Sequence, residues 1–233
     1  RRSEMIKFFQ SAKPCLVGME ACATAHYWAR ELTKLGHEVK LIPPSYVKPF
    51  VRRGAKNDAA DAAAICEAVR RPDMRFVPIK SEANQGFLML HRARGLLVRQ
   101  RTMAVCAIRA HLAEFGIIFG QGRQRIETIM PSIEEVAASL PEHARFALNS
   151  LMRTVGELNT QIEGIETKLA EVGRSDPVSN LLSSIPGVGP ITSTASAATV
   201  PNARMFRSGR EFAAWLGLTP RQNSSGGTTR LGG

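Results

Sequence analysis

Cysteine is scarce in this chain, and its spacing suits neither zinc nor a disulfide framework. The four cysteines stand at irregular intervals, and none belongs to a CxxC pair. The histidines His26, His91 and His111 do not complete a zinc pattern with them. We therefore expect reduced and mostly buried thiols, as is usual in cytoplasmic proteins.

Long hydrophobic runs are also absent. No apolar stretch approaches the ~20 residues that a membrane-spanning helix needs, and no signal peptide is recognised. We expect a cytoplasmic protein with no membrane partner. The chain begins without an initiator methionine and stops at Gly233 with no closing element, so we also expect a fragment of a longer protein.

Acidic residues are few relative to basic ones. The 233 residues include 31 Lys and Arg against 20 Asp and Glu, a formal net charge of +11. This excess favours a polyanionic partner, with nucleic acid first and an acidic membrane surface second. Arginine dominates the excess, and its planar fork suits phosphate. A merely basic protein remains the alternative.

The first 80 residues predict a small α/β unit. Its strand–helix–strand order implies a mostly parallel sheet. The carboxyl ends of such strands are where active groups gather, and Glu20 stands at that end of the first strand. A solvated strand end is the alternative for Glu20. The expected elements, in order, are a helix, a buried strand, a helix, a strand, a helix and a strand over residues 3–10, 14–19, 22–35, 39–42, 57 onward and 75–79.

A helix start near Asn57 carries the most suggestive pair of acids. Asn57 is a good N-cap, and alanines follow it. Asp58 and Asp61 are three residues apart, so both carboxylates lie on one face of the first turn. Mg²⁺, which prefers oxygen ligands, would relieve their repulsion. Acids in a first turn also simply complement the helix dipole, which is the alternative.

Basic residues precede this helix and follow the α/β unit. A long helix is expected over 81–115, where Arg92 and Arg99, and likewise Arg94 and Arg101, are a heptad apart. These rows face either nucleic acid or water. The loop before the acidic helix is expected to contact a phosphate backbone, or to be merely solvated. Its basic residues include Arg52, Arg53 and Lys56.

The clearest helix covers residues 141–172 and carries an a/d seam typical of a coiled coil. The seam pairs either with the 81–115 helix or with a second copy of the chain, and it favours a homo-oligomer. The seam residues are Leu148, Leu151, Val155, Leu158, Ile162, Ile165, Leu169 and Val172.

Residues 181–191 predict a helix-hairpin-helix. The turn glycines Gly187 and Gly189 would let backbone N–H groups approach a phosphate. An ordinary helical hairpin is the alternative. Further on, Ser224 and Ser225 precede two glycines in an expected exposed turn.

Taken in order, these segments resemble the DEDD transposases of bacterial insertion sequences, in the insertion-sequence-110 family and its 1111 subgroup. The resemblance covers nearly the whole chain. It rests on Met19-Glu20-Ala21-Cys22, on Lys56-Asn57-Asp58-Ala59-Ala60-Asp61-Ala62, on the Ile-Pro-Gly-Val-Gly-Pro hairpin and on the closing segment Trp-Leu-Gly-Leu-Thr-Pro-Arg-Gln-Asn-Ser-Ser-Gly-Gly.

The resemblance implies an architecture of α/β plus all-α parts. An RNase H-like unit of the Holliday-junction-resolvase kind would cover residues 1–80. A coiled-coil helical insert would cover 81–172, and a helical C-terminal transposase domain with the helix-hairpin-helix would cover 173–233.

The resemblance also implies a DNA recombinase, directed in some members by a structured RNA. Glu20, Asp58 and Asp61 would be three of four acids that bind Mg²⁺, and the first acid would lie upstream of Arg1. Ser225 matches the nucleophile, with Ser224 as the alternative. We count Arg221 among the nucleic-acid-binding residues.

Two other functions remain open at this stage. One is a resolvase-like nuclease that uses metal-activated water, with the serine turn purely structural. The other is a non-catalytic nucleic-acid-binding module or transposase remnant.

Overall fold

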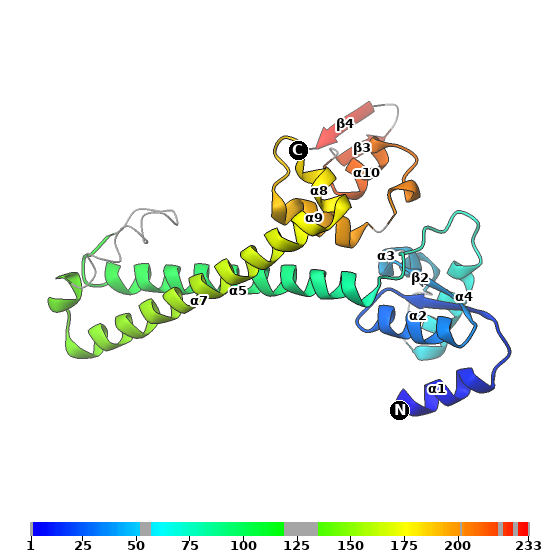
Figure 1. Cartoon of the computed structure of the whole chain (residues 1–233), viewed down its shortest axis with the longest axis horizontal. Coiled ribbons are helices and arrows are strands. Elements are labelled where there is room, and N and C mark those ends of the chain that lie inside the picture. Colours follow the sequence, from blue (N-terminus) through cyan, green and yellow to red (C-terminus); the bar gives the residue numbers. More distant parts are fainter. Residues whose placement is uncertain are drawn as a thin grey trace. The chain divides into compact units, whose positions relative to one another are not determined.

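A computed structural model describes residues 2–51, 57–118, 135–200 and 202–218, and the backbone of two strands at 221–225 and 228–232. The chain divides into two compact units, Arg1–Thr199 and Val200–Gly233, which are described separately. Figure 1 shows the order of the elements along the chain.

The first unit opens with the predicted strand–helix–strand. Its elements are α1 (Arg2–Ser11), β1 (Leu16–Glu20), α2 (Ala25–Lys34) and β2 (Glu38–Ile42). The strands β1 and β2 are parallel, in a register that runs from Leu16↔Glu38 to Glu20↔Ile42. The parallel sheet is therefore confirmed. The predicted burial of the first strand is wrong, because every residue of β1 is at least partly exposed.

The predicted strand at 75–79 is reduced to one contact. Val77 forms an isolated antiparallel bridge with Leu41, and its N–H donates to the Leu41 carbonyl at 2.7 Å. Pro78 follows directly and has no N–H to donate, so the ladder does not extend.

Helix α2 packs on the sheet through one stripe. Ala25, Ala29 and Leu32 are buried at helical spacing against Val39 and Leu41 of β2. The helix ends as its sequence predicts, because the next glycine, at position 36, has a φ of +88°. Glycine adopts this left-handed conformation without strain.

The chain next forms α3 (Pro44–Val47), η1 (Lys48–Phe50) and α4 (Asp58–Val69). Helix α4 lies close against β1 at Gly18, where an added Cβ would be 3.0 Å from both Ile65 and Val69. A second buried cluster lies between α4 and the end of β2. It consists of Ile42, Val47, Ala64 and Ala68.

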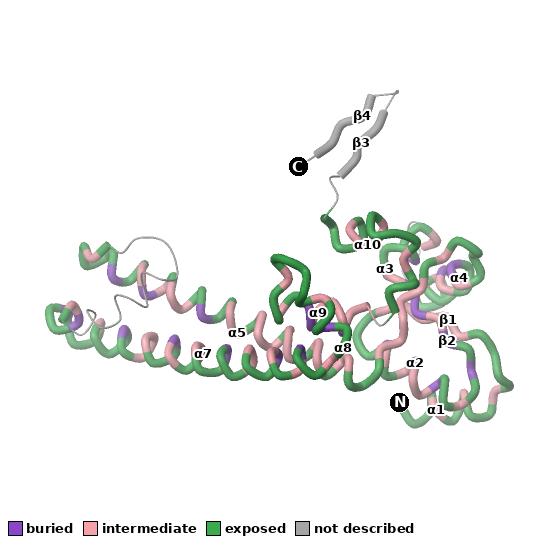
Figure 2. The backbone as a smooth tube through the Cα atoms, turned by 45° about the horizontal axis from the view of Figure 1, so that its top comes forward, coloured by how far each residue is buried: buried purple, intermediate pink, exposed green. Residues whose placement is uncertain are grey.

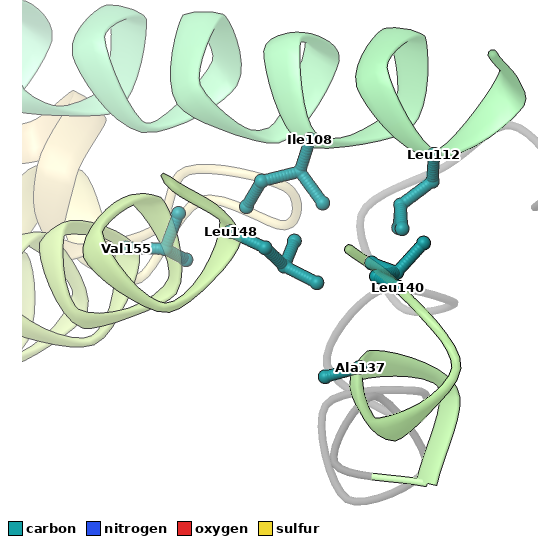
Figure 3. Packing of buried hydrophobic residues seen from close by; sticks show 6 residues of the cluster. All are labelled: Ile108, Leu112, Ala137, Leu140, Leu148 and Val155. Atoms are coloured by element: carbon teal, nitrogen blue, oxygen red, sulfur yellow. The ribbon is translucent and has the colours of Figure 1, made fainter. Parts of the chain in front are cut away.

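The predicted long helices form one antiparallel hairpin, α5 (Glu82–Ala113) and α7 (Glu142–Ser175). Figure 2 shows buried positions recurring along both helices. The a/d seam of α7 packs against α5 of the same chain, so the intrachain alternative is confirmed. Figure 3 shows Ile108 and Leu112 of α5 turned toward Leu148 and Val155 of α7, with Leu140 and Ala137 beside them.

One of the two predicted arginine rows is inside this hairpin. Arg94 forms an ion pair with Glu166 at 2.6 Å. Arg101 is only 8% exposed, and its Nη1 donates to Asn159 Oδ1 at 2.8 Å. The expectation that this row faces nucleic acid or water is therefore wrong: its guanidinium groups bind polar partners on α7. Arg92 and Arg99 are exposed.

The predicted helix-hairpin-helix consists of α8 (Pro177–Ser183) and α9 (Pro190–Thr199). The two helices are joined by a hydrogen bond from Ser183 Oγ to Ser193 Oγ at 2.9 Å. Helix α9 packs on the base of the α5–α7 hairpin, where Thr194 Oγ1 lies 3.1 Å from His91 Nε2. The division into two units falls directly after α9.

The second unit contains η2 (Ala203–Met205), α10 (Gly209–Trp215) and the antiparallel strands β3 (Arg221–Ser225) and β4 (Thr228–Gly232). Phe206 contacts both Phe212 and Trp215, at ring-centroid distances of 5.1 and 5.6 Å. The expectation that the two serines form a turn is wrong, because Ser224 and Ser225 are the last residues of β3 and pair with Thr229 and Thr228 of β4.

All four cysteines are exposed, so the prediction of mostly buried thiols is wrong. Cys66 and Cys106 occupy positions of α4 and α5 outside the packed stripes of those helices.

Among the described helices, none combines the length and the apolar character needed to cross a bilayer.

Candidate active site

Glu20 occupies the predicted position at the carboxyl end of β1. Directly after it the chain turns: the Ala21 N–H donates to the Ile42 carbonyl at 2.8 Å, and the Cys22 N–H donates back to the Glu20 carbonyl at 2.8 Å. The Glu20 side chain is partly exposed. Its carboxylate has no hydrogen-bond or ion-pair partner in the part of the chain that the structure describes.

The first turn of α4 is capped as predicted. Asn57 Oδ1 accepts a hydrogen bond from the Ala60 N–H at 2.8 Å. Asp58 and Asp61 are both exposed, and neither has a partner among the described residues. Because Asn57 already caps the helix, both carboxylates remain free to accept another ligand.

The three acids lie on elements that touch, but the expected common site is not formed by the described residues. Helix α4 contacts β1 at Gly18, two residues before Glu20. Even so, no group of three or more His, Cys, Asp or Glu within the described ranges is arranged to hold a metal ion. The donor set itself fits a hard cation, since it consists of unpartnered carboxylates.

The other predicted site residues are dispersed. Ser224 and Ser225 belong to β3 in the second unit, opposite Thr229 and Thr228. Arg221 starts the same strand. The predicted basic loop with Arg52, Arg53 and Lys56 lies outside the described residues.

The glycines of the hairpin turn are exposed, as phosphate contact requires. Gly187 has a φ of +86°, and an added Cβ would meet nothing within 4 Å at either Gly187 or Gly189. Gly189 directly precedes α9. The turn therefore has open space beside it in the first unit.

A basic pocket beside Glu20 was not predicted from the sequence. It has a volume of about 400 Å³ and is lined by Ala21–Thr24, His26, Lys80 and Arg92, among others. Burial, followed by the charges of Lys80, Arg30 and Arg92, lowers the pKa of His26 to about 4. The only signal in the sequence was Arg92, because Lys80 and His26 are more than 50 residues apart.

Comparison with known proteins gives the class first. A family model described as a transposase, of the DEDD type associated with IS110, matches residues 2–117. This range contains Glu20, Asp58 and Asp61. The class is therefore that of the transposases, which are DNA recombination enzymes.

A second family model and individual relatives narrow the class. The model described as "Transposase IS116/IS110/IS902 family" matches residues 179–233. The transposase for IS1328 of Yersinia enterocolitica is 41% identical over 100% of this chain and 69% of its own length. The chain belongs to the IS116/IS110/IS902 family of transposases.

Two more relatives agree with this assignment. The y4pF/y4sB protein of Sinorhizobium fredii, assigned as a transposase, is 49% identical over 99% of this chain and 59% of its own length. The transposase for IS1111A of Coxiella burnetii is 35% identical over 97% of this chain and 62% of its own length. The chain thus spans about three fifths of the length of some curated relatives that it matches.

Proposed function

We propose that the whole protein cleaves and rejoins DNA strands during transposition of an insertion sequence, with Mg²⁺ at the acidic residues and Ser225 as the nucleophile. The observation that carries this proposal is the set of unpartnered carboxylates at Glu20, Asp58 and Asp61, inside the range matched by the DEDD transposase model. An additional acid from the rest of the protein would complete the ligand set.

The acids have a defined task in this proposal. Glu20, Asp58 and Asp61 would hold the cation and orient the scissile phosphate beside it. When bound, the metal supplies Lewis-acid stabilisation of the charge that develops on the phosphate. The partial exposure of all three side chains leaves room for a DNA strand to approach.

The serine carries out the covalent step. Ser225 Oγ forms a bond to phosphorus, and the P–O bond to the leaving strand breaks. The hydroxyl proton passes through solvent to the leaving oxygen. The phosphoserine link conserves the bond energy, so the reverse attack by a strand end rejoins DNA without an added energy source.

Other exposed groups would hold the nucleic acid. Arg92 and Arg99 lie on α5, and the N–H groups near Gly187 and Gly189 can meet a phosphate. Arg52, Arg53, Lys56 and Arg221 complete the predicted set. A structured guide RNA and a second copy of the protein are further partners in this proposal, and the second copy would need a surface other than the α7 seam, which α5 covers.

The test uses the full-length protein and a DNA carrying both element ends. Ser225→Ala is expected to abolish the covalent protein–DNA adduct, while Ser224→Ala, the matched control one position earlier, keeps it. Asp58→Asn is expected to lower strand cleavage at least ~100-fold, the range typical for loss of an electrostatic catalyst. An adduct formed by Ser225→Ala would show that the nucleophile is wrongly assigned.

The division of the chain favours one second candidate. Glu20, Asp58 and Asp61 are in the first unit, whereas Ser224 and Ser225 are in the second. A resolvase-like nuclease needs only the first unit, with metal-activated water as its nucleophile. Metal-dependent cleavage with no covalent adduct in the unsubstituted protein would select this candidate.

A further inference from the structure

The pocket beside the carboxyl end of β1 is basic and has no acidic lining. Its wall includes Lys80, Arg92 and His26, and neither Asp nor Glu is among the residues that line it. Within the described ranges, neither Lys80 nor Arg92 has a carboxylate partner. Two neighbouring cations without a counter-charge cost free energy that a bound anion recovers.

The proximity of these cations affects their protonation. Burial, and after it the charge of Arg92, lowers the pKa of Lys80. The lysine is thus partly withdrawn from water and close enough to Arg92 to feel its charge. An anion between them would stabilise both charged forms.

His26 contributes a hydrogen-bond donor to the same space. Its Nδ1 accepts from the Lys80 backbone N–H at 3.3 Å, so the neutral ring carries its proton on Nε2. Nε2 is 3.4 Å from Lys80 Nζ. The Lys80 ammonium has further N–H donors, which an oxygen acceptor in the pocket can bind.

The walls of the pocket are tied together before any ligand arrives. Arg30 of α2 donates from Nη1 to the Lys80 carbonyl at 2.8 Å and to Gln85 Oε1 at the start of α5. These contacts between α2 and the start of α5 preorganise the pocket.

A polyanion fits this pocket better than a free ion does. Arg92 is exposed, so the pocket opens to the surface of α5. Arg99, also exposed, follows two helical turns further on, about 10 Å along the axis. A nucleic acid strand can contact both, because its phosphates repeat along its length.

We propose that this pocket binds one backbone phosphate of DNA, held by Lys80, Arg92 and His26 next to the strand end that carries Glu20. Ala21 and Cys22, which line the pocket, follow Glu20 directly. The pocket would thereby place a DNA strand beside Glu20. The choice of DNA as ligand rests on the proposed function.

The test measures the binding of the 233-residue chain to a labelled 30-base-pair duplex by fluorescence anisotropy, in EDTA and over a range of salt concentrations. Lys80→Met and Arg92→Met are each expected to weaken binding about 5- to 10-fold and to lower the slope of log K against log salt by about 1. The matched controls are Lys7→Met and Arg145→Met, which remove exposed charges outside the pocket and are expected to weaken binding less than about 2-fold.

Equal losses in the pocket variants and the controls would overturn the proposal, because general charge would then explain the binding. A loss seen with single-stranded RNA but not with DNA would overturn the choice of ligand. Circular dichroism checks the fold of each variant. If Lys80→Met does not fold, Arg92→Glu at an exposed position still decides the outcome. Because EDTA excludes the metal, the result is independent of strand cleavage, and the two proposals fail separately.

Discussion

At the scale of single residues, Gly18 determines how closely α4 approaches the sheet. The residue lies in the middle of β1, and the position that its Cβ would take is 3.0 Å from Ile65 and Val69. Few real Cβ atoms come this close to a neighbouring carbon, so Ile65 and Val69 would have to shift by a few tenths of an ångström. Since α4 carries the two aspartates, this contact also sets where its first turn lies.

We predict that Gly18→Ala lowers the free energy of unfolding by about 1–3 kcal/mol, because the added methyl group overpacks the contact between β1 and α4. The control is the same substitution at Gly164, where nothing lies within 4 Å of the added Cβ. Gly164→Ala is expected to stabilise α7 by about 0.5–1 kcal/mol. Urea denaturation of both variants measures the difference. A neutral Gly18→Ala would mean that α4 is not held against β1 in this way.

The sequence predicted single residues well where a local rule applies. Asn57 was identified as an N-cap from the alanines that follow it, and it does cap α4. Arg94 and Arg101 were misjudged, because a charged residue on a helix is usually exposed. Nothing in their own sequence context reveals Glu166 and Asn159, which lie on the facing helix.

At the scale of elements, the α5–α7 hairpin is held by the apolar seam of α7. Leu148, Val155, Leu158, Ile162 and Leu169 are all less than 10% exposed. The seam packs on α5, where Leu148 and Val155 share a cluster with Ile108 and Leu112, and this burial is the main favourable term for a helix pair. The Arg94–Glu166 ion pair adds little, since both side chains are partly exposed.

Shortening one seam side chain tests whether apolar burial holds the α5–α7 hairpin together. Ile162→Ala is expected to lower the free energy of unfolding by about 2–4 kcal/mol, because it removes buried methyl groups and leaves a cavity. Phe146, on the same helix, is 76% exposed. Phe146→Ala is therefore expected to change stability by less than about 0.5 kcal/mol. Comparable effects of the two substitutions in thermal melts would contradict the assigned packing.

Element boundaries were predictable to within a few residues, but element partners were not. The three- and four-residue spacing of the α7 seam is the same whether the partner is α5 or a second chain. The predicted strand at 75–79 does not extend past the Val77 bridge, because Pro78 continues the apolar pattern but has no N–H to continue the hydrogen bonding. Likewise, the acids were placed on the correct elements, but their separation depends on packing that no periodicity encodes.

At the scale of the whole molecule, the buried core belongs to the first unit. Every buried hydrophobic residue that the structure describes comes before residue 200, and the described part of the second unit contains no buried residue. The second unit instead has the aromatic group of Phe206, Phe212 and Trp215.

We predict that a chain ending at Thr199 keeps its helical circular dichroism. Its midpoint of thermal unfolding should lie within about 5 °C of that of the 233-residue chain, because a change of a few tenths of a kcal/mol in the free energy of unfolding shifts the midpoint only slightly. When the full-length protein is ended at Thr199, it should form no covalent protein–DNA adduct, because Ser225 is deleted. Loss of cooperative unfolding in the truncated chain would show that the second unit is needed for folding of the first.

The length of α5 has a consequence for DNA geometry. The pocket residues Gln85 and Arg92 lie near its start, and its 32 residues make it about 48 Å long. With α7 bracing it along the seam, this helix is a rigid spacer rather than a tether. From Arg92 to the last residue of α5, Ala113, the helix rises about 32 Å, so duplex bound at the pocket and again at that end would be held at a fixed spacing of about 9 base pairs, at ~3.4 Å each.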